Sequence, residues 1–302
     1  MENNGNINSP PFIPTKTGGV GGSLNSPLGT GGSIGIFDSG YGGLTILEKI
    51  RTELPEYDYI YLGDNARTPY GTRSFDVVYK YTLECVNQLF EMGCQLVVLA
   101  CNTASAKALR TIQQNNLPLL DPNRRVLGVI RPTVEAVVKM TKTKHIGLLA
   151  TSGTVQSNSY PLEIYKLNEN IVVTSEACPM WVPLIENNEH NSSGADYFIR
   201  KNVAHLLAED LEIDTIMLGC THYPLLEDKI KSLLPNGIYI VSQGEIVAKS
   251  LADYLIRHPE MDSRCTKNAS IQYFTTESIE KFSSSASIFL NEDINARHLD
   301  LG

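Results

Sequence analysis

No apolar run in the sequence approaches the ~18–20 residues that a helix needs to span a bilayer, so we expect no transmembrane segment. The N-terminus lacks a basic stretch followed by an apolar one, and we therefore expect no secretory signal. Positive charge is scarce. The 25 Lys and Arg are outnumbered by 33 Asp and Glu, and the formal net charge of −8 argues against a general nucleic-acid or membrane-surface binder.

The six cysteines contain no C-x-x-C pair, and they are too scattered over 302 residues to suggest a disulfide framework. Reduced thiols in a cytoplasmic protein are the better interpretation. Nucleotide-binding motifs are missing as well, since neither G-x-G-x-x-G nor G-x-x-x-x-G-K-[ST] occurs. Residues 1–33 are dominated by Gly, Asn, Ser, Thr and Pro, and we expect them to form a flexible N-terminal extension.

From residue 34 onward, short apolar segments alternate with amphipathic ones. IGIFD (34–38) is typical of a strand, and GLTILEKIRTEL (43–54) of a helix with one apolar face. Such alternation predicts right-handed βαβ units and mostly parallel sheets covered on both faces. A weak repeat relates IGIFDSG to IGLLATSG and LVVLACNT to TIMLGCTH, which predicts two related α/β halves.

Two predicted strands end in a cysteine followed by polar residues. LVVLACNTASA (96–106) places Cys101 before Asn102 and Thr103, and IMLGCTHYPLL (216–226) places Cys220 before Thr221 and His222. Because ligands bind beyond the carboxyl ends of strands in open α/β sheets, we expect the two thiols on opposite walls of one cleft. A helix beginning just after Cys101, capped by Thr103 or Asn102, and another near Pro224 are expected to favour thiolate formation.

Four interpretations of this pair are open. Cysteines at strand ends often fill a core. Cys101, Cys220 and His222 could bind a metal, although no close ligand pair supports a metal site. Cys220 with His222 could be the nucleophile of a hydrolase, which leaves Cys101 idle. The interpretation that uses both thiols is inversion of a stereocentre without a cofactor, in which one cysteine removes a proton and the other delivers one.

Each thiol has a candidate partner for this chemistry. His222 lies two residues from Cys220, and Asp38 ends the first strand of the half that carries Cys101. The segment SGYGG (39–43) leads into a helix, and its backbone N–H groups are suited to a carboxylate. DNARTPYG (64–71) closes the next strand–helix junction with polar groups. The substrate is therefore expected to be an anionic molecule with an acidic α-carbon.

Together these segments resemble the glutamate racemases, cofactor-independent enzymes that supply D-glutamate for bacterial cell-wall synthesis. IGIFDSGYGGLTIL, DNARTPYG, ACNTASA, CPMWVPLIE and LGCTHYPLL look like the successive motifs of that family, and FTTESIEKFSSSASIFL resembles its closing segment. The resemblance runs from about residue 34 to the end of the chain. It implies two flavodoxin-like parallel-sheet domains related by pseudo-two-fold symmetry, with the active site in the cleft between them. The implied domains are residues 34–127 plus 241–302 and residues 128–240.

The resemblance also implies roles for individual residues. Cys101 and Cys220 correspond to the two acid/base residues, with Asp38 at the first, His222 at the second and Glu186 also linked to catalysis. The implied substrate contacts are Asp38, Ser39, Pro69, Tyr70, Gly71, Asn102, Thr103, Thr154, Thr221 and His222. The family uses no cofactor or metal, and we expect a homodimer that binds glutamate rather than nucleic acid or membrane.

Two alternatives to a glutamate racemase remain open. An aspartate racemase uses the same two-cysteine logic, and some racemases of this family also inhibit DNA gyrase, so a protein-binding module is conceivable. One departure from the family pattern is Arg131 in GVIRPT, which is expected to pair with a neighbouring acid or to lie at a dimer contact. The long N-terminal extension is a second departure.

Overall fold

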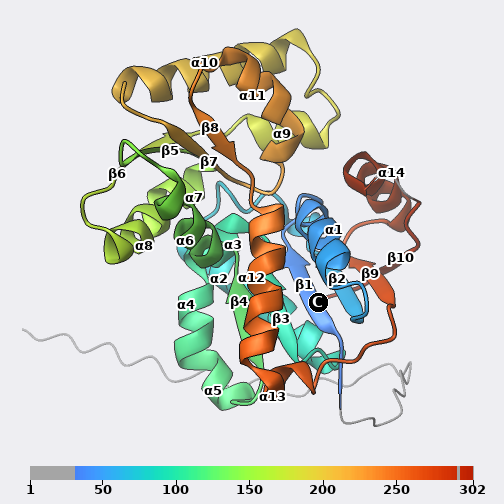
Figure 1. The fold of residues 1–302 in the computed structure, drawn as a ribbon. Coiled ribbons are helices and arrows are strands. Elements are labelled where there is room, and N and C mark those ends of the chain that lie inside the picture. Colours follow the sequence, from blue (N-terminus) through green and yellow to red (C-terminus); the bar gives the residue numbers. More distant parts are fainter. Residues whose placement is uncertain (1–30, 291–292, 302) are drawn as a thin grey trace, which may run out of the picture. The chain divides into compact units, whose positions relative to one another are not determined.

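The computed structural model describes residues 31–290 and 293–301. The predicted flexible extension lies outside these residues up to position 30. Ten strands form two parallel sheets in the described part of the chain (Figure 1). The first sheet has the order β10-β9-β2-β1-β3-β4 and the second the order β6-β5-β7-β8.

The strands agree with the apolar segments of the sequence. The six-stranded sheet contains β1 (Ile34–Asp38), β2 (Tyr59–Gly63), β3 (Leu96–Leu99), β4 (Arg125–Gly128), β9 (Ile271–Thr275) and β10 (Ala296–His298). The four-stranded sheet contains β5 (His145–Ala150), β6 (Val172–Ala177), β7 (Thr215–Gly219) and β8 (Tyr239–Val241). Both contain the order 2-1-3-4 typical of flavodoxin-like folds, which confirms the predicted fold class and agrees with the internal repeat.

Helices cover both faces of each sheet. Those next to the six-stranded sheet are α1 (Gly43–Glu53), α2 (Phe75–Glu91), α3 (Asn102–Lys107), α4 (Leu109–Thr111), α5 (Leu117–Leu120), α12 (Gly244–Arg257), α13 (Pro259–Asp262) and α14 (Ile279–Leu290), with η1 (Asn65–Arg67) and the π-helical turn η2 (Ile112–Asn116). Those next to the four-stranded sheet are α6 (Ile130–Met140), α7 (Ser152–Gln156), α8 (Ser159–Leu167), α9 (Trp181–Glu186), α10 (Ser193–Glu209), η3 (Tyr223–Leu226) and α11 (Glu227–Leu233).

Strand β1 illustrates how one strand supplies two cores. Ile34 and Ile36 pack with α1 and α12, whereas Phe37 packs with α2 on the opposite face. Alternate side chains of a strand point to opposite faces, so a strand buried on both sides is apolar throughout. Helix α2 begins as the sequence predicts, because Ser74 Oγ accepts a hydrogen bond from the Val77 N–H.

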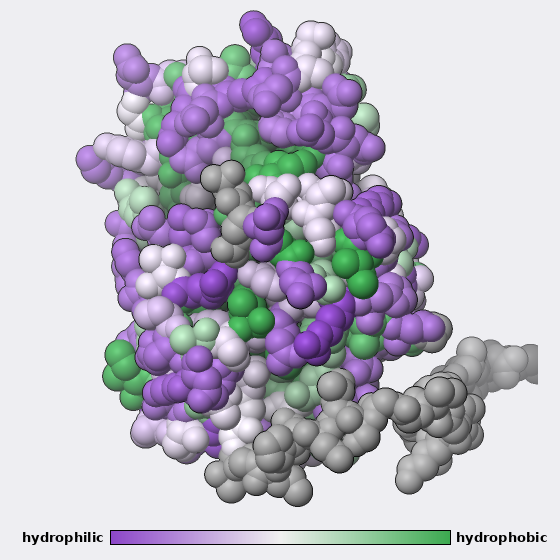
Figure 2. Space-filling model, turned by 90° about the vertical axis from the view of Figure 1, so that its right-hand side faces the viewer, coloured by the Kyte–Doolittle hydropathy of each residue, from purple (hydrophilic) through white to green (hydrophobic). Residues whose placement is uncertain are grey.

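The chain passes between the two sheets twice. After β4 it enters α6, which packs on the four-stranded sheet, and after β8 it enters α12, which lies beside α1 (Figure 1). The predicted domain limits at residues 127/128 and 240/241 stay a prediction. In the described part of the chain, no helix is both long enough and apolar enough to cross a membrane. On the face that carries α14, hydrophilic side chains predominate and the hydrophobic ones form separate patches (Figure 2).

Candidate active site

A cavity of ≈ 60 Å³ lies where the carboxyl ends of the two sheets meet. Its lining comes from loops that follow β1, β2, β3, β5, β6 and β7. The lining residues are Ser39, Thr68, Pro69, Tyr70, Gly71, Thr72, Cys101, Asn102, Thr103, Thr151, Ser152, Cys178, Pro179, Val182, Pro183, Cys220, Thr221 and His222. The structure thus brings Cys101 and Cys220 into one cavity, each from a different sheet.

Cys101 follows β3 and is itself the N-cap of α3. Its sulfur accepts the Ala104 N–H at 3.5 Å, so the predicted caps Asn102 and Thr103 are wrong, and both lie inside the helix. Ser39 Oγ lies 3.3 Å from the sulfur. Burial, and then the charge of Asp38, raise the pKa of the Cys101 thiol to about 12, against the opposing hydrogen bonds from Ser39 and Ala104. Cys101 is therefore a neutral thiol near pH 7.

Asp38 is the last residue of β1 and is buried. Its carboxylate accepts the Gly40 N–H at 3.0 Å and the Thr221 hydroxyl at 3.4 Å, so it reaches residues of both sheets. Burial raises the pKa of Asp38, and His222 opposes this effect. A carboxylate with a raised pKa is a stronger base than an exposed one. Asp38 does not line the cavity.

Cys220 follows β7 and belongs to a chain of polar groups. Its sulfur lies 3.9 Å from His222 Nδ1, and His222 Nε2 lies 3.0 Å from Glu186 Oε1 at the end of α9. Burial lowers the pKa of His222, but the hydrogen bonds to Cys220 and Glu186 outweigh this and raise it to about 10. Near pH 7 the residue is an imidazolium beside Cys220. Phe289 of α14 packs edge-on against its ring, a contact the sequence did not predict.

The remaining predicted contacts divide into two groups. Pro69, Tyr70 and Gly71 line the cavity, and the Gly71 carbonyl accepts the Gly153 N–H at 2.6 Å across the two sheets. Thr103 lines it too, with its hydroxyl 3.3 Å from that of Thr154. Thr154 and Glu186, the second of which was predicted to be catalytic, do not line the cavity.

Lys107 is a buried residue near the cavity that the sequence analysis missed. Its ammonium group donates to the Arg73 carbonyl at 2.7 Å, next to the loop of Tyr70 and Gly71. A β-carbon on Gly153 would meet the same nitrogen at 2.9 Å. Burial lowers the pKa of Lys107. It lies on α3, six residues after Cys101, but the sequence alone gives no signal that this lysine packs near the cavity.

Asn102 is held by a buried polar network that the sequence also did not predict. Its amide donates to Gln243, and its carbonyl oxygen accepts the Tyr160 hydroxyl at 2.6 Å. Gln243 in turn donates to Tyr160 at 2.7 Å and to Thr133 at 2.9 Å. Gln243 is 141 positions from Asn102, so no local pattern links them. The network fixes the start of α3 against residues next to the four-stranded sheet.

Replacing Gln243 by Ala is expected to lower the free energy of unfolding by roughly 2–4 kcal/mol, because Asn102 and Tyr160 lose partners while buried. Urea denaturation followed by circular dichroism measures this. The control Gln114→Ala changes an exposed glutamine and is expected to shift the value by less than about 0.5 kcal/mol. Equal midpoints for the two variants would contradict the role given to the network.

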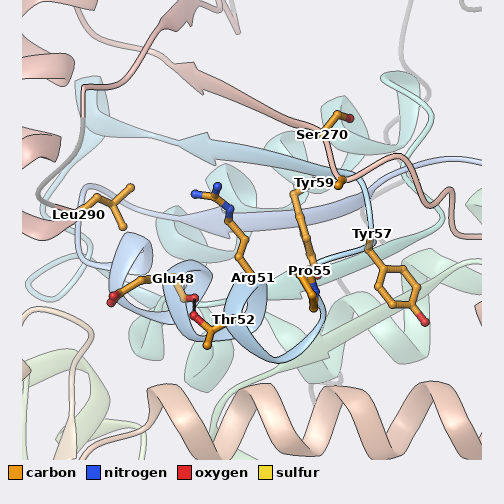
Figure 3. A pocket seen from close by; sticks show the side chains of 9 residues that line it. Glu48, Arg51, Thr52, Pro55, Tyr57, Tyr59, Ser270 and Leu290 are labelled. Carbon is orange, nitrogen blue, oxygen red and sulfur yellow. Dashed lines mark hydrogen bonds between the residues drawn. The ribbon is translucent and has the colours of Figure 1, made fainter.

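Two larger hollows are less suited to acid–base chemistry. One of ≈ 320 Å³ lies beside α1 (Figure 3) and is lined by Glu48, Arg51, Thr52, Pro55, Tyr57, Tyr59, Ala269, Ser270 and Leu290. Another of ≈ 640 Å³ includes Arg131. The residues that line these hollows include neither cysteine nor histidine. In residues 31–290 and 293–301, no group of three or more His, Cys, Asp or Glu is placed to hold a metal.

Arg131 pairs with neighbouring acids, one of the two expectations for it. Its guanidinium lies 2.6 Å from Glu135 and 3.3 Å from Glu163, and all three residues are at least partly exposed.

Comparisons with known proteins identify the family of the chain. Residues 42–251 match the family described as Asp/Glu/Hydantoin racemase. A glutamate racemase from Listeria monocytogenes is 38% identical over 272 residues, which cover 89% of this chain and 98% of that protein. One from Ruegeria is 38% identical and covers 87% of this chain and 98% of its own length.

Solved structures lead to the same family. A glutamate racemase isoform from Bacillus anthracis superimposes with a TM-score of 0.81 at 36% identity, covering 89% of this chain and 98% of that one. The Francisella tularensis glutamate racemase in complex with D-glutamate has a TM-score of 0.80 at 30% identity and covers 90% and 98% of the two chains. The chain therefore belongs to the aspartate/glutamate racemase family of isomerases.

Proposed function

We propose that this protein interconverts L- and D-glutamate by a two-base mechanism in which Cys101 and Cys220 act on opposite faces of the α-carbon, without a cofactor. The observation that carries the proposal is the placement of both thiols, from two different sheets, in the lining of one cavity. The relatives named glutamate racemases and the related structure with bound D-glutamate support glutamate as the substrate.

Cys220 is the cysteine with an adjacent cation. The His222 imidazolium attracts negative charge on the Cys220 sulfur, and Glu186 holds the imidazolium from its other side. A thiolate here takes the α-proton from one face of the substrate. The electrons left on the α-carbon are stabilised by the adjacent carboxylate of the substrate, which the hydrogen-bond donors of the cavity hold in place.

Cys101 supplies the proton on the opposite face. Its raised pKa of about 12 keeps it protonated and ready to donate. In the reverse direction it must first lose that proton; the charge of Asp38 opposes this loss, the hydrogen bonds from Ser39 and the Ala104 N–H favour it, and Asp38, whose pKa burial also raises, is the neighbouring base proposed to take the proton. Each thiol thus has one auxiliary group, Asp38 for Cys101 and His222 for Cys220. The two thiols exchange the roles of acid and base when the direction of the reaction changes.

The polar lining of the cavity is suited to the two carboxylates of glutamate. Hydroxyl groups of Ser39, Thr103 and Thr221 surround the thiols, and Pro69, Tyr70 and Gly71 line the cavity as well. Tyr70 donates a hydrogen bond from its hydroxyl to the buried Asp64, which fixes its ring. We assign substrate contacts to these residues and to Asn102 and His222.

The biological setting follows from this function. D-glutamate is a component of bacterial peptidoglycan, so we propose that the enzyme works in the cytoplasm in support of cell-wall synthesis and cell shape.

We also propose a homodimer. Exposed apolar side chains on α8, Leu162 and Tyr165, support a contact between copies of the chain. The division into residues 34–127 plus 241–302 and residues 128–240 belongs to the same proposal.

The test is proton exchange at the α-carbon. Purified protein is incubated in deuterium oxide with each enantiomer of glutamate and, separately, of aspartate, with a chelator and no added cofactor. Circular dichroism and α-deuterium incorporation are expected to show racemisation of glutamate only. Turnover of aspartate instead would leave the fold and chemistry in place and overturn the substrate. No exchange with either amino acid in folded, reduced protein would overturn the proposed catalysis.

A further inference from the structure

The side chains of Asn102, Gln243 and Tyr160 form a closed ring of hydrogen bonds. Asn102 Nδ2 donates to Gln243 Oε1 at 2.5 Å, and Gln243 Nε2 donates to the Tyr160 hydroxyl at 2.7 Å. This hydroxyl donates to Asn102 Oδ1 at 2.6 Å and so closes the ring. All three residues are buried, with exposed fractions of 0% for Tyr160 and 2% for the other two. Since water does not reach these groups, each of them depends on its partner in the ring.

Such a ring could run in either direction, because an amide that turns over exchanges its donor and its acceptor. The reversed ring would place Asn102 Oδ1 against Gln243 Nε2, and Asn102 Nδ2 against the Tyr160 hydroxyl. It would contain the same number of hydrogen bonds. A contact outside the ring must therefore decide its direction.

Thr133 supplies that contact. Its hydroxyl has one proton and donates it to the Val129 carbonyl at 2.7 Å, and a carbonyl oxygen can only accept. The Thr133 oxygen is thus left as an acceptor, and Gln243 Nε2 donates to it at 2.9 Å. If Gln243 turned over, its Oε1 would face this oxygen with no proton between them, which is costly in a buried site. The backbone carbonyl of Val129 therefore fixes the direction of the ring.

The direction of the ring decides what Asn102 offers to a bound molecule. Asn102 lines the cavity. Its Oδ1 accepts from Tyr160, and one N–H of its amide donates to Gln243, the one acceptor of this nitrogen among the described residues. The second N–H is thus available to a substrate. In the reversed ring an Oδ1 lone pair would take the place of this N–H, and it would repel a carboxylate.

We propose that Thr133, Gln243 and Tyr160 are positioning residues that hold Asn102 with an N–H directed at the substrate, and that they thereby select a carboxylate at this point of the cavity. The inference rests on the proposed function, because it assigns Asn102 to one of the two carboxylates of glutamate. The three positioning residues lie on α6, just before α12 and on α8. None of them lines the cavity, so they act through Asn102.

Thr133→Val tests the direction of the ring without changing a member of the ring. Valine keeps the shape of the side chain and removes the acceptor of Gln243, so the two directions become similar in free energy. If one of two equally populated states binds glutamate, the apparent affinity falls about twofold. We therefore expect KM for glutamate, and the Kd of D-glutamate measured by calorimetry, to rise about two- to threefold, while kcat stays within about 1.5-fold. Thr133→Ser keeps the hydroxyl and should restore both values.

Thr82→Val is the matched control. Thr82 is also fully buried, and its hydroxyl donates to the carbonyl four residues earlier at 2.7 Å. It lies on α2 and does not line the cavity. This variant should keep the KM and Kd of wild type. Unchanged KM and Kd in Thr133→Val, a loss in kcat alone, or an equal rise of KM in Thr82→Val would overturn the inference.

A double-variant cycle tests the direction of the ring without enzyme activity. Asn102→Asp replaces the Nδ2 donor by an oxygen that faces Gln243 Oε1, so the urea midpoint of unfolding is expected to fall. In a Thr133→Val background Gln243 can turn over and donate to the new carboxylate, and the fall should be clearly smaller. Additive falls would overturn the inference. If Asn102→Asp folds in neither background, the KM and Kd of Thr133→Val decide.

The wild-type protein separates this inference from the proposed function. Racemisation of glutamate by wild type, with unchanged KM and Kd in Thr133→Val, would overturn the inference alone. A wild type that binds D-glutamate without racemising it would overturn the proposed catalysis, and the Kd of Thr133→Val would still decide the inference. A wild type that binds no glutamate would overturn the proposed substrate, and with it the carboxylate assigned to Asn102.

Discussion

Replacing Cys101 or Cys220 by Ala is expected to slow glutamate racemisation by about 10³-fold or more, the scale of losing one acid–base group. Inversion needs proton removal on one face and proton delivery on the other, so neither cysteine can substitute for its partner. Polarimetry or circular dichroism of each enantiomer measures the loss. Cys178→Ala is the matched control, since Cys178 also lines the cavity but is assigned no proton transfer.

A substrate analogue with a leaving group distinguishes the roles of the two thiols. Elimination of HCl from 3-chloroglutamate needs only one base. The thiolate takes the α-proton, the C–H electrons form the carbon–carbon double bond, and chloride leaves. The resulting enamine tautomerises to an imine, and water hydrolyses this to 2-oxoglutarate and ammonium. Each single-cysteine variant is therefore expected to retain elimination from one enantiomer at Cα and to lose it with the other.

The two variants must retain elimination from opposite enantiomers of 3-chloroglutamate. The cysteines come from different sheets and are proposed to act on opposite faces of the same carbon. If both variants lost elimination from the same enantiomer, both thiols would be needed on that face and the assignment of one thiol to each face would be wrong. A variant with wild-type racemisation would remove its cysteine from the mechanism altogether.

The two cysteines at strand ends could be predicted from the sequence because the pattern that marks them is local. Apolar runs that stop at Cys101 and Cys220 predicted two strands, and the parallel sheets then place their ends together. The near-repeat of β1 with β5 and of β3 with β7 predicted two related halves for the same reason. Short elements were less visible. Strand β10 has three residues and no apolar alternation, and its pairing with β9 is set by tertiary contacts.

Partners that are distant in the chain could not be predicted. The sequence suggested Asp38 as the partner of Cys101, but the nearest hydrogen-bonding side chain is Ser39, and Asp38 acts on the thiol through its charge. The Asn102–Gln243 contact likewise depends on how loops from several strands pack. Local patterns identify which residues reach the sheet edge, whereas packing decides which of them touch.

The second large effect concerns the pH dependence of the reaction. His222 is protonated below about pH 10, and the proposed mechanism needs this imidazolium beside Cys220. Activity that depends on it is present at lower pH and is lost as the pH rises through about 10. Glu186 contributes to the raised pKa both as a hydrogen-bond partner and by its charge. Replacing Glu186 by Gln keeps the shape of the side chain and removes the charge.

Glu186→Gln is therefore expected to lower the pKa of His222 and to move the alkaline limb of the rate profile down by roughly 1–2 pH units, the usual effect of losing one close opposite charge. At a pH between the old and new limbs the variant should be about tenfold slower than wild type, since each pH unit beyond the limb changes the protonated fraction tenfold. Rates of racemisation measured from pH 6 to pH 11 test this, with about 10 as the expected limb for wild type.

Glu189→Gln is the control, because it removes the same charge from an exposed position three residues away. Salt screens exposed charges, so this variant should leave the limb in place. If both variants moved the limb equally, general electrostatics would account for the shift and the Glu186–His222 contact would have no special part in it. If neither moved it, the imidazolium would not be the group whose loss ends activity, and proton transfer at Cys220 would have to depend on another residue of the cavity.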